Sequence, residues 1–281
     1  AIWDDSFDAS FPIFLRGTLV AAVLFHWRDK RPSFREMELL LPFLEGIGLA
    51  VENIRQKQRI QRREHFATIG ELAAGLAHEV RTPAGVIKGA AQFLTREARP
   101  KEREFLDIIV EEADRLNGVV TEFLEYARPS QRAPRTVSLR EPVEKAMALL
   151  LREKGERMSR VRHHVLLPDP APSVNADPNE IERVVYNLLT NAVEAMPQGG
   201  DLTVRVSSVE GEGRIAVEDS GAGIPAEDRP QLFRPFFTTR ERGVGMGLAI
   251  CRRIVEEYGG SISVDSVPAR GSRFTVKLPE A

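Results

Sequence analysis

Residues 70–83 read Gly-Glu-Leu-Ala-Ala-Gly-Leu-Ala-His-Glu-Val-Arg-Thr-Pro. With successive residues about 100° apart, the apolar positions from here onward share one arc of a helix: Leu72, Leu76, Val80, Pro83 and Ile87. His78 lies roughly opposite the centre of that arc, so we expect its side chain to face solvent. Thr82, one helical turn further on, projects from nearly the same face.

The side chains around this histidine suit nucleophilic chemistry. Glu79 can take or hold the imidazole proton of His78, which makes the ring a candidate nucleophile. An exposed histidine on a helix is, however, usually only a solvated surface residue. Pro83 removes a backbone donor, so we expect the helix to bend just past His78, either as part of a site or as a simple packing kink.

A second amphipathic helix follows the first. The first pattern continues to about Arg96, a turn is expected at Arg99-Pro100, and residues 101–126 carry another apolar stripe at helical spacing. Two helices with a short connection form an antiparallel hairpin. Because one hairpin cannot cover both stripes, we expect two chains to form a four-helix bundle.

The N-terminal part combines strands with a long helix. Alternating apolar residues over 11–27, around Arg16-Gly17, predict two strands joined by a turn. A helical pattern begins at Phe34 and passes without a stop signal through 49–65, where heptad spacing continues over a polar middle. This middle predicts either a marginal coiled coil or an exposed basic helix face. A weak seam would suit a signalling helix with two registers close in energy.

The C-terminal half is of mixed type. Residues 129–136 carry two prolines and no apolar period, which is typical of a linker. Beyond them, helical patterns at 141–152, 179–196 and 248–258 are interspersed with the alternating patterns of strands at 202–206, 214–218, 261–265 and 273–278. This mixture predicts an α/β sandwich over residues 137–281.

Composition narrows the classes of protein. The 281 residues, 42% of them hydrophobic, can supply more than one packed core. A formal charge of -2 favours neither nucleic acid nor an anionic membrane as a partner. The single Cys251 excludes an internal disulfide and fits a reducing cytosol. No apolar run reaches the roughly 18 residues of a membrane span. We therefore expect a cytoplasmic location, with room for a membrane segment upstream because the chain begins with Ala1.

Two stretches of the last domain bear groups that suit a nucleotide. Asn187 and Asn191 lie one turn apart on the same helix face, and amide oxygens can hold Mg²⁺ against phosphates. Asp219 ends a predicted strand, where its carboxylate can accept a hydrogen bond from an exocyclic amine. Gly221 and Gly223 let the backbone approach a flat base.

A third stretch suits phosphates. Gly243, Gly245 and Gly247 lead into a helix, and their amides together with the helix start can cradle anions. This is not a P-loop, because the Gly-Lys-Ser/Thr ending is absent. Each of these three stretches also occurs in ordinary caps, turns and loops, so none is specific by itself.

Taken in order, the stretches resemble the sensor histidine kinases of two-component systems. Residues 78–83 are similar to the phosphoacceptor box, most closely to its nitrogen-regulator type. Later stretches resemble elements of the GHKL ATPase fold, which gyrase, Hsp90 and MutL share. They are similar to the N box (182–192), the adenine-binding box (219–225), the F box and lid (233–240) with the glycine string that follows (243–248), and the last glycine element (271–275). The front of the chain resembles only the closing strands and helix of a GAF sensor domain.

The resemblance implies a division of the chain into five parts. These are a partial GAF-like sensor domain, a coiled-coil signalling helix, a dimerisation and phosphotransfer domain, a linker and a catalytic ATP-binding domain: 1–48, 49–65, 66–128, 129–136 and 137–281. It also implies a homodimer. The turn near Arg99-Pro100 would decide whether phosphorylation occurs within or between subunits.

The resemblance also implies an activity. ATP and Mg²⁺ would phosphorylate His78 with Glu79 as general base, and the phosphoryl group would pass to an aspartate on the receiver domain of a response regulator. Thr82 would assist dephosphorylation of that regulator. Asn191 is the implied Mg²⁺ ligand, and the implied nucleotide-binding residues are Asn187, Asn191, Asp219, Gly221, Gly223, Arg240, Gly243, Gly245, Gly247 and Thr275.

The ATP-binding domain departs from the family's usual pattern at two positions. Arg240 stands where the family commonly has lysine, and its planar donor fork is not equivalent to an ammonium group. Val244 replaces a common threonine.

The first rival function is that of a clamp ATPase of the same fold. Such an enzyme would use glutamate at the position of Asn187, so direct ATP hydrolysis should be slow here. The other rival is a dimeric scaffold without activity, against which the intact His78 and Asp219 speak.

Overall fold

The computed structural model describes residues 9–15, 18–26, 41–96, 98–127, 134–240 and 243–281. It divides into two compact units, residues 1–68 and 69–281. In the first unit, β1 (Ala9–Leu15) and β2 (Thr18–Phe25) pair antiparallel, with a register shift between Ile13 and Phe14. The two predicted strands are therefore confirmed. Their assignment to a GAF-like domain stays a prediction, and the expected helix start at Phe34 lies outside the described residues.

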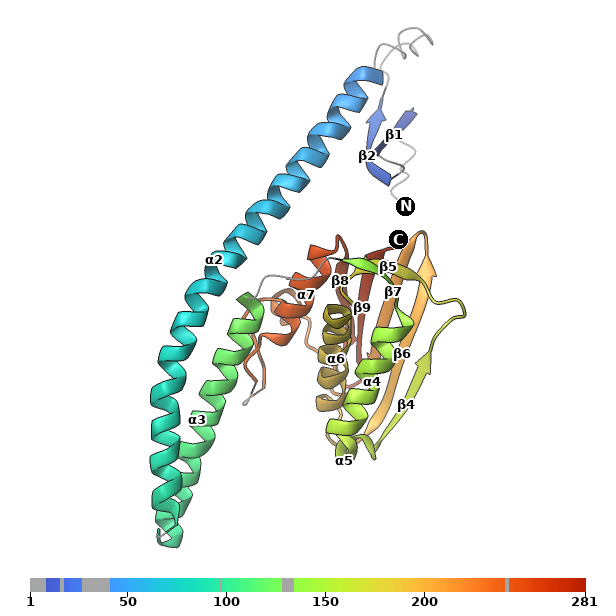
Figure 1. Cartoon of the computed structure of the whole chain (residues 1–281). Helices are drawn as coiled ribbons and strands as arrows, with labels where there is room; N and C mark the ends of the chain where they lie inside the picture. The colour runs from blue at the N-terminus through green and yellow to red at the C-terminus, as the bar shows by residue number, and fades with distance from the viewer. Residues whose placement is uncertain (1–8, 16–17, 27–40, 97, 128–133, 241–242) are drawn as a thin grey trace. The chain divides into compact units, whose positions relative to one another are not determined.

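The helix α2 (Leu41–Thr95) is 55 residues long and passes through Pro83 without interruption (Figure 1). It includes the predicted signalling segment 49–65 and the predicted first helix of the hairpin. The side chains of residues 58–75 lie outside the described part, so the heptad spacing over this polar middle stays a prediction. The bend expected after His78 also stays a prediction. Among the helices that the structure describes, none has the length and hydropathy required to cross a bilayer.

The second unit begins with the predicted antiparallel hairpin, formed by the end of α2 and by α3 (Pro100–Ala127). Side-chain hydrogen bonds join the helices. Among them, Arg81 Nη2 donates to Thr121 Oγ1 at 2.7 Å, and Lys88 Nζ donates to Asp114 Oδ2 at 2.8 Å. Both contacts follow one antiparallel register. In that register, His78 lies at the level of the C-terminal turns of α3.

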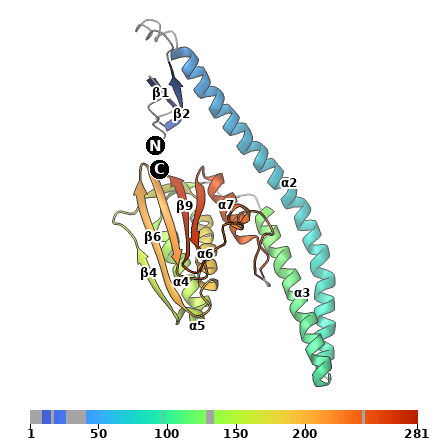
Figure 2. The ribbon, with the colours of Figure 1, turned by 180° about the vertical axis from the view of Figure 1, so that it is seen from behind.

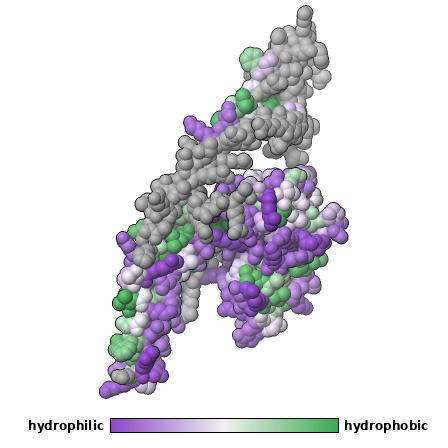
Figure 3. Space-filling model, in the orientation of Figure 1, coloured by the Kyte–Doolittle hydropathy of each residue, from purple (hydrophilic) through white to green (hydrophobic). Residues whose placement is uncertain are grey.

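The inner face of the hairpin is made of small residues. Ala77, Ala84 and Ala91 recur every seventh residue on α2, are 3%, 2% and 3% exposed, and share a side with Arg81 and Lys88. The larger apolar residues that dominate the sequence pattern instead remain exposed: Leu76, Val86, Ile87, Phe93, Leu94, Phe105, Ile108, Ile109 and Leu116. Hydrophobic surface is visible on the hairpin at the lower left of Figure 3. A single hairpin thus leaves apolar surface uncovered, as the sequence predicted.

The rest of the second unit is an α/β sandwich. Its five-stranded sheet has the order β4-β6-β7-β9-β8, with β4 (Val161–Leu166) parallel to β6 (Gly200–Val209) and the remaining pairs antiparallel. The other three strands are β7 (Glu212–Asp219), β8 (Ser261–Val267) and β9 (Gly271–Pro279). A separate antiparallel pair joins β3 (Arg135–Ser138) to β5 (Ser173–Ala176).

Three helices cover one face of this sheet: α4 (Arg140–Glu153), α6 (Pro178–Glu194) and α7 (Gly247–Glu257). Seen from behind, the sheet's other face is not covered by any described element (Figure 2). Two short helical turns complete the domain, α5 (Gly155–Met158) and η1 (Arg229–Gln231). The predicted helices and four predicted strands are confirmed, whereas β3, β4 and β5 were not anticipated from the sequence.

Strict alternation along β7 and β9 positions the candidate site. On β7, Ile215, Val217 and Asp219 are buried on the helix-covered face, and β9 presents Phe274 to the same side. Because successive side chains of a strand point to opposite faces, Asp219 ends β7 pointing toward the helices. Thr275, next to Phe274, points to the opposite face.

Candidate functional site

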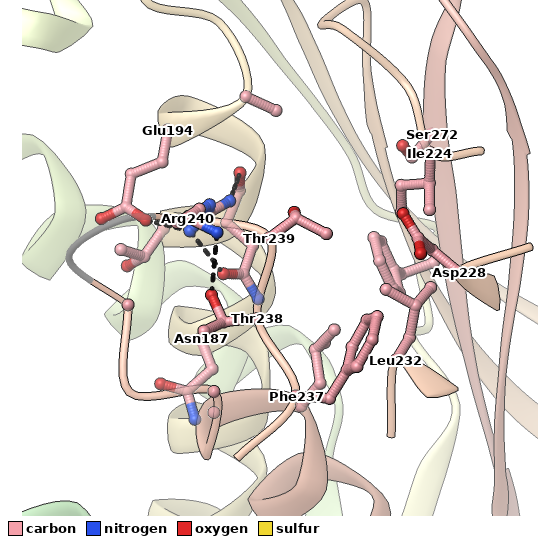
Figure 4. A pocket seen from close by; sticks show the side chains of 18 of the residues that line it. Asn187, Glu194, Ile224, Asp228, Leu232, Phe237, Thr238, Thr239, Arg240 and Ser272 are labelled. Carbon is pink, nitrogen blue, oxygen red and sulfur yellow. Dashed lines mark hydrogen bonds and ion pairs between the residues drawn. The ribbon is translucent and has the colours of Figure 1, made fainter. Parts of the chain in front are cut away.

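A cavity of about 910 Å³ lies between α6, the loop after β7 and the start of α7. It brings together most of the residues that the sequence singled out in this domain: Asn187, Asn191, Asp219, Gly223, Arg240, Gly243, Gly245 and Gly247. Figure 4 shows Asn187 and Arg240 among the lining side chains. Gly221 lies beside Asp219 and donates its backbone N–H to Asp219 Oδ1 at 2.8 Å. Thr275 is not among the lining residues, and β9 contributes Ser272 and Phe274 instead.

Asp219 provides a desolvated carboxylate at one end of the cavity. It is 9% exposed, and burial raises the pKa of its carboxyl group, while backbone N–H donors from Gly221 and Ser272 act in the opposite direction. A buried carboxylate with spare lone pairs can accept a hydrogen bond from a planar amine. This chemistry fits the exocyclic amine of adenine.

The glycine loop, residues 243–247, is shaped by contacts with the segment before it. Gly245 has φ +75°, and a Cβ there would lie 2.6 Å from the carbonyl oxygen of Phe237, so no other residue fits without rearrangement. At Gly247, by contrast, an added Cβ would meet only Asn187 Cγ, at 4.0 Å. The absence of a side chain therefore keeps space open beside Asn187.

The start of α7 faces this open space. The N-cap residue of α7, Met246, makes no side-chain capping bond, and the first turn contains no acidic residue. Backbone N–H groups at an uncapped helix start and the positive end of the helix dipole favour anions. The loop and helix start are thus suited to phosphate groups.

The other wall of the cavity is α6, which begins at the capping residue Asp177 with Pro178 in its first turn. Asn187 and Asn191 lie one turn apart on this helix, both half-buried. Asn191 Oδ1 accepts a hydrogen bond from Arg240 Nη1 at 3.2 Å, and Arg240 also pairs with Glu194 (Figure 4). The amide oxygen of Asn191 and the carboxylate of Glu194 are the hard oxygen donors that Mg²⁺ prefers.

Sequence reasoning missed four acidic residues of the site, one of which is Asp228 at the N-cap of η1. Glu194 follows Asn191 by three residues on the same face of α6, a spacing that could have identified it. Glu122 and Glu125 belong to α3 and line the same cavity, which no local pattern indicates. Burial, and then the neighbouring Glu125, raise the pKa of the Glu122 carboxyl group.

Polar and aromatic contacts hold α3 against this part of the sandwich. Glu125 forms an ion pair with Arg183 of α6 at 2.5 Å, and the rings of Phe123 and Phe236 stack with centroids 6.3 Å apart. Tyr126 and Phe123 also pack against the core of the sandwich. The C-terminal end of α3 is therefore part of the cavity wall.

The predicted phosphoacceptor residues lie on α2. The backbone of His78 is helical, but its side chain lies outside the described residues, so its expected exposure stays a prediction. Glu79 and Thr82 are exposed. The structure therefore places the His78 group on the helical hairpin and the nucleotide-type cavity in the sandwich.

A phosphoacceptor-type hairpin joined to an ATPase-type sandwich defines the class of histidine kinases. Residues 176–281 match the family described as histidine kinase-, DNA gyrase B- and HSP90-like ATPase, and residues 68–132 match the His Kinase A (phospho-acceptor) domain. The sensor histidine kinase ZraS of Escherichia coli (strain K12) is 37% identical over 232 residues, 80% of this chain and 50% of that protein. The chain belongs to the sensor histidine kinases of two-component systems.

Solved structures agree with this assignment. Full-length ShkA in complex with AMPPNP superposes with a TM-score of 0.60 and 26% identity, covering 75% of this chain and 46% of that chain. Histidine kinase ThkA in complex with the response regulator protein TrrA gives 0.59 and 29%, covering 81% and 66%. The chain spans about half the length of the ZraS relatives that it matches.

Proposed function

We propose that this protein uses ATP and Mg²⁺ to phosphorylate its own His78 and then transfers the phosphoryl group to an aspartate of a response regulator. The observation that carries the proposal is the single cavity that gathers Asn187, Asn191, Asp219 and the glycine loop. The phosphoacceptor-type helix belongs to the same chain. The AMPPNP bound to full-length ShkA supports ATP as the nucleotide.

Each wall of the cavity has a part in binding ATP. Asp219 accepts a hydrogen bond from the adenine amine, and the backbone near Gly223 approaches the base. The glycine loop and the start of α7 hold the triphosphate by their N–H groups. Asn191 Oδ1 is the proposed ligand of Mg²⁺, which neutralises phosphate charge when bound.

The chemical step belongs to the hairpin. The imidazole nitrogen of His78 attacks the γ-phosphorus in line, an N–P bond forms, the bond to the bridging oxygen breaks, and ADP leaves. Glu79, next to His78 on α2, takes the imidazole proton. Asn187 cannot act as a general base toward water, because an amide has no accessible proton-accepting pKa. This favours transfer to a histidine over hydrolysis.

The partners follow from the same arrangement. The complex of ThkA with TrrA supports a receiver domain as the second substrate. Thr82, one turn from His78, is proposed to assist dephosphorylation of that regulator. The apolar residues left exposed on the hairpin, among them Ile87 and Leu94, support a homodimer joined through a four-helix bundle. Because ATP and receiver domains are cytoplasmic, we place this part of the chain in the cytoplasm.

Labelling with [γ-³²P]ATP tests the proposal. The protein should acquire an acid-labile, base-stable label that His78→Gln abolishes. His164→Gln, which alters an exposed histidine of β4, is the matched control and should retain the label. Steady phosphate release without labelled protein would support a clamp ATPase instead, and neither label nor release would support a scaffold.

A further inference from the structure

The C-terminal turn of α6 carries three oxygen acceptors that one guanidinium group occupies. Arg240 Nη1 donates to Asn191 Oδ1 at 3.2 Å, and Arg240 Nη2 donates to the backbone oxygen of Asn191 at 3.1 Å. The same Nη1 pairs with the carboxylate of Glu194, the last residue of the helix. The negative end of a helix dipole adds to this attraction for a cation. The turn is thus a cation site in which Arg240 supplies the cation.

We propose that Arg240 competes with Mg²⁺ for Asn191 Oδ1, and that Glu194 sets how firmly the arginine holds its place. This inference rests on the proposed function, because it takes Asn191 as the metal ligand. Mg²⁺ binds oxygen at about 2.0–2.1 Å and a guanidinium group hydrogen-bonds the same oxygen, so two cations would share one small acceptor. Their mutual repulsion at such short range makes the two occupants exclude each other.

The displaced arginine has a destination in the same cavity. Gly243 N donates to the backbone oxygen of Arg240 at 3.2 Å, which ties Arg240 to the glycine loop that is proposed to bind the phosphates. Its own N–H is held by Thr238 Oγ1 at 3.1 Å. With the backbone anchored in this way, rotation of the side chain alone would let the guanidinium leave α6. Its planar fork could then pair with phosphate oxygens of a bound nucleotide.

Competition between Arg240 and Mg²⁺ for Asn191 Oδ1 gives a reason for arginine at this position. A lysine ammonium is a point charge, whereas the guanidinium fork reaches the side-chain oxygen, the backbone oxygen and the carboxylate together. Arg240 is therefore a positioning residue. It keeps the last turn of α6 neutralised while the nucleotide is absent and is released when Mg²⁺ arrives.

Binding of AMPPNP to the full 281-residue chain tests the exchange. The informative quantity is the ratio of the dissociation constant in EDTA to that in excess Mg²⁺, measured by calorimetry. Glu194→Gln removes the counter-ion of Arg240, so the ratio should rise about two- to fivefold, as for a partly exposed ion pair. Simple loss of a carboxylate near the metal would change the ratio in the opposite direction, because Mg²⁺ would be attracted less.

A double-mutant cycle assigns the effect to Arg240. Arg240→Gln serves as the background, and Glu194→Gln should produce no rise of the ratio relative to Arg240→Gln alone. Glu144→Gln breaks a comparable exposed pair with Arg140, 3.4 Å apart on α4 and outside the cavity lining, and should leave the ratio unchanged. A ratio that is equal or lower in Glu194→Gln, or a rise that persists without Arg240, would overturn the inference.

Failure of the proposed function would look different. In that case the unmodified chain would bind no AMPPNP with or without Mg²⁺, or would carry no label on His78. If the unmodified chain binds normally, a crystal structure with Mg²⁺ and AMPPNP gives a second test. Arg240 should then have left Asn191 Oδ1, and an arginine still bonded to that oxygen beside the metal would contradict the competition.

Discussion

Asp219 ends β7 with its carboxylate on the buried face of the sheet, and burial raises its pKa above the ordinary value of 3.8. The ionised form is therefore less stable in the folded protein than in water. Its contribution to stability is complete below about pH 3.8 and is lost as the pH rises through the raised pKa. At neutral pH, Asp219 is retained at a cost to the fold, which is typical of binding residues.

Asp219→Asn should weaken nucleotide binding without lowering the stability of the fold. The amide still accepts a hydrogen bond from Gly221 N–H but bears no charge, so the melting temperature of the variant at pH 7 should equal or exceed that of the unmodified chain. This difference in melting temperature should shrink as the pH falls toward 3.8. AMPPNP affinity should fall at least tenfold, because hydrogen bonds to charged groups contribute about 1.5–3 kcal/mol. Thermal unfolding across pH and calorimetry give the two readouts.

Asp201 offers a matched control of opposite sign. Its exposed carboxylate accepts a hydrogen bond from Arg162, which lowers its pKa. Its contribution is present above the ordinary pKa and is lost as the pH falls, so Asp201→Asn should not raise the melting temperature. A lower melting temperature for Asp219→Asn at pH 7 would contradict the argument from burial.

At the scale of elements, the sequence predicted those helices and strands that bury one face. β7 and β9 alternate because one side meets the helices, and α6 and α7 carry apolar stripes for the same reason. β4 was missed because only Val161 of its six residues is buried, so its pattern Val-Arg-His-His-Val-Leu has no period. β3 and β5, with four residues each, are too short to show one.

The hairpin shows a second limit of sequence patterns. Large apolar residues attract attention, yet Ala77, Ala84 and Ala91 form the buried face of α2 while Ile87 and Phe93 are exposed. The residues of the candidate site likewise divide into those that a local pattern indicates and those that only packing brings there. Asn191, Asp219 and the glycines lie in local motifs and could be predicted, whereas Glu122 and Glu125 reach the cavity only through the packing of α3.

The three buried alanines of α2, here called the alanine seam, lead to a prediction about the hairpin. Ala91→Leu inserts bulk at a position that is 3% exposed, which should separate the helices and destabilise the hairpin by about 1–3 kcal/mol. Gln92→Leu adds a leucine to the neighbouring exposed position and should change stability little. Thermal unfolding followed by circular dichroism distinguishes the two. Equal effects would mean that the seam is not closely packed.

At the scale of the second unit, the end of α3 closes part of the cavity in which nucleotide binding is proposed. Phe236 has φ 66°, which is rare for a residue with a side chain, and its ring stacks on Phe123 of α3. The Arg183–Glu125 ion pair lies in the same contact. This packing brings Glu122 to a cavity that already contains Glu194 and that is proposed to receive a triphosphate. Docking of α3 and binding of ATP therefore oppose each other electrostatically.

Glu122→Gln should relieve this opposition. With the charge removed, AMPPNP should bind several-fold more tightly, and the gain should shrink at high salt because screening weakens the repulsion. The pKa of Glu122 is raised, so its proton is bound at higher pH than usual and the repulsion is lost as the pH falls through that pKa. The affinity of the unmodified chain should then approach that of the variant under acidic conditions.

Two further variants connect this effect to the docking of α3. Phe123→Ala removes the ring that stacks on Phe236 and should also tighten AMPPNP binding, because α3 then leaves the cavity more readily. Adding Glu122→Gln to it should have little further effect, since a carboxylate that has moved away no longer repels the phosphates. Glu104→Gln, at the exposed far end of α3, controls for the change in net charge. Fully additive effects would show that Glu122 acts on the nucleotide independently of the contact between α3 and the sandwich.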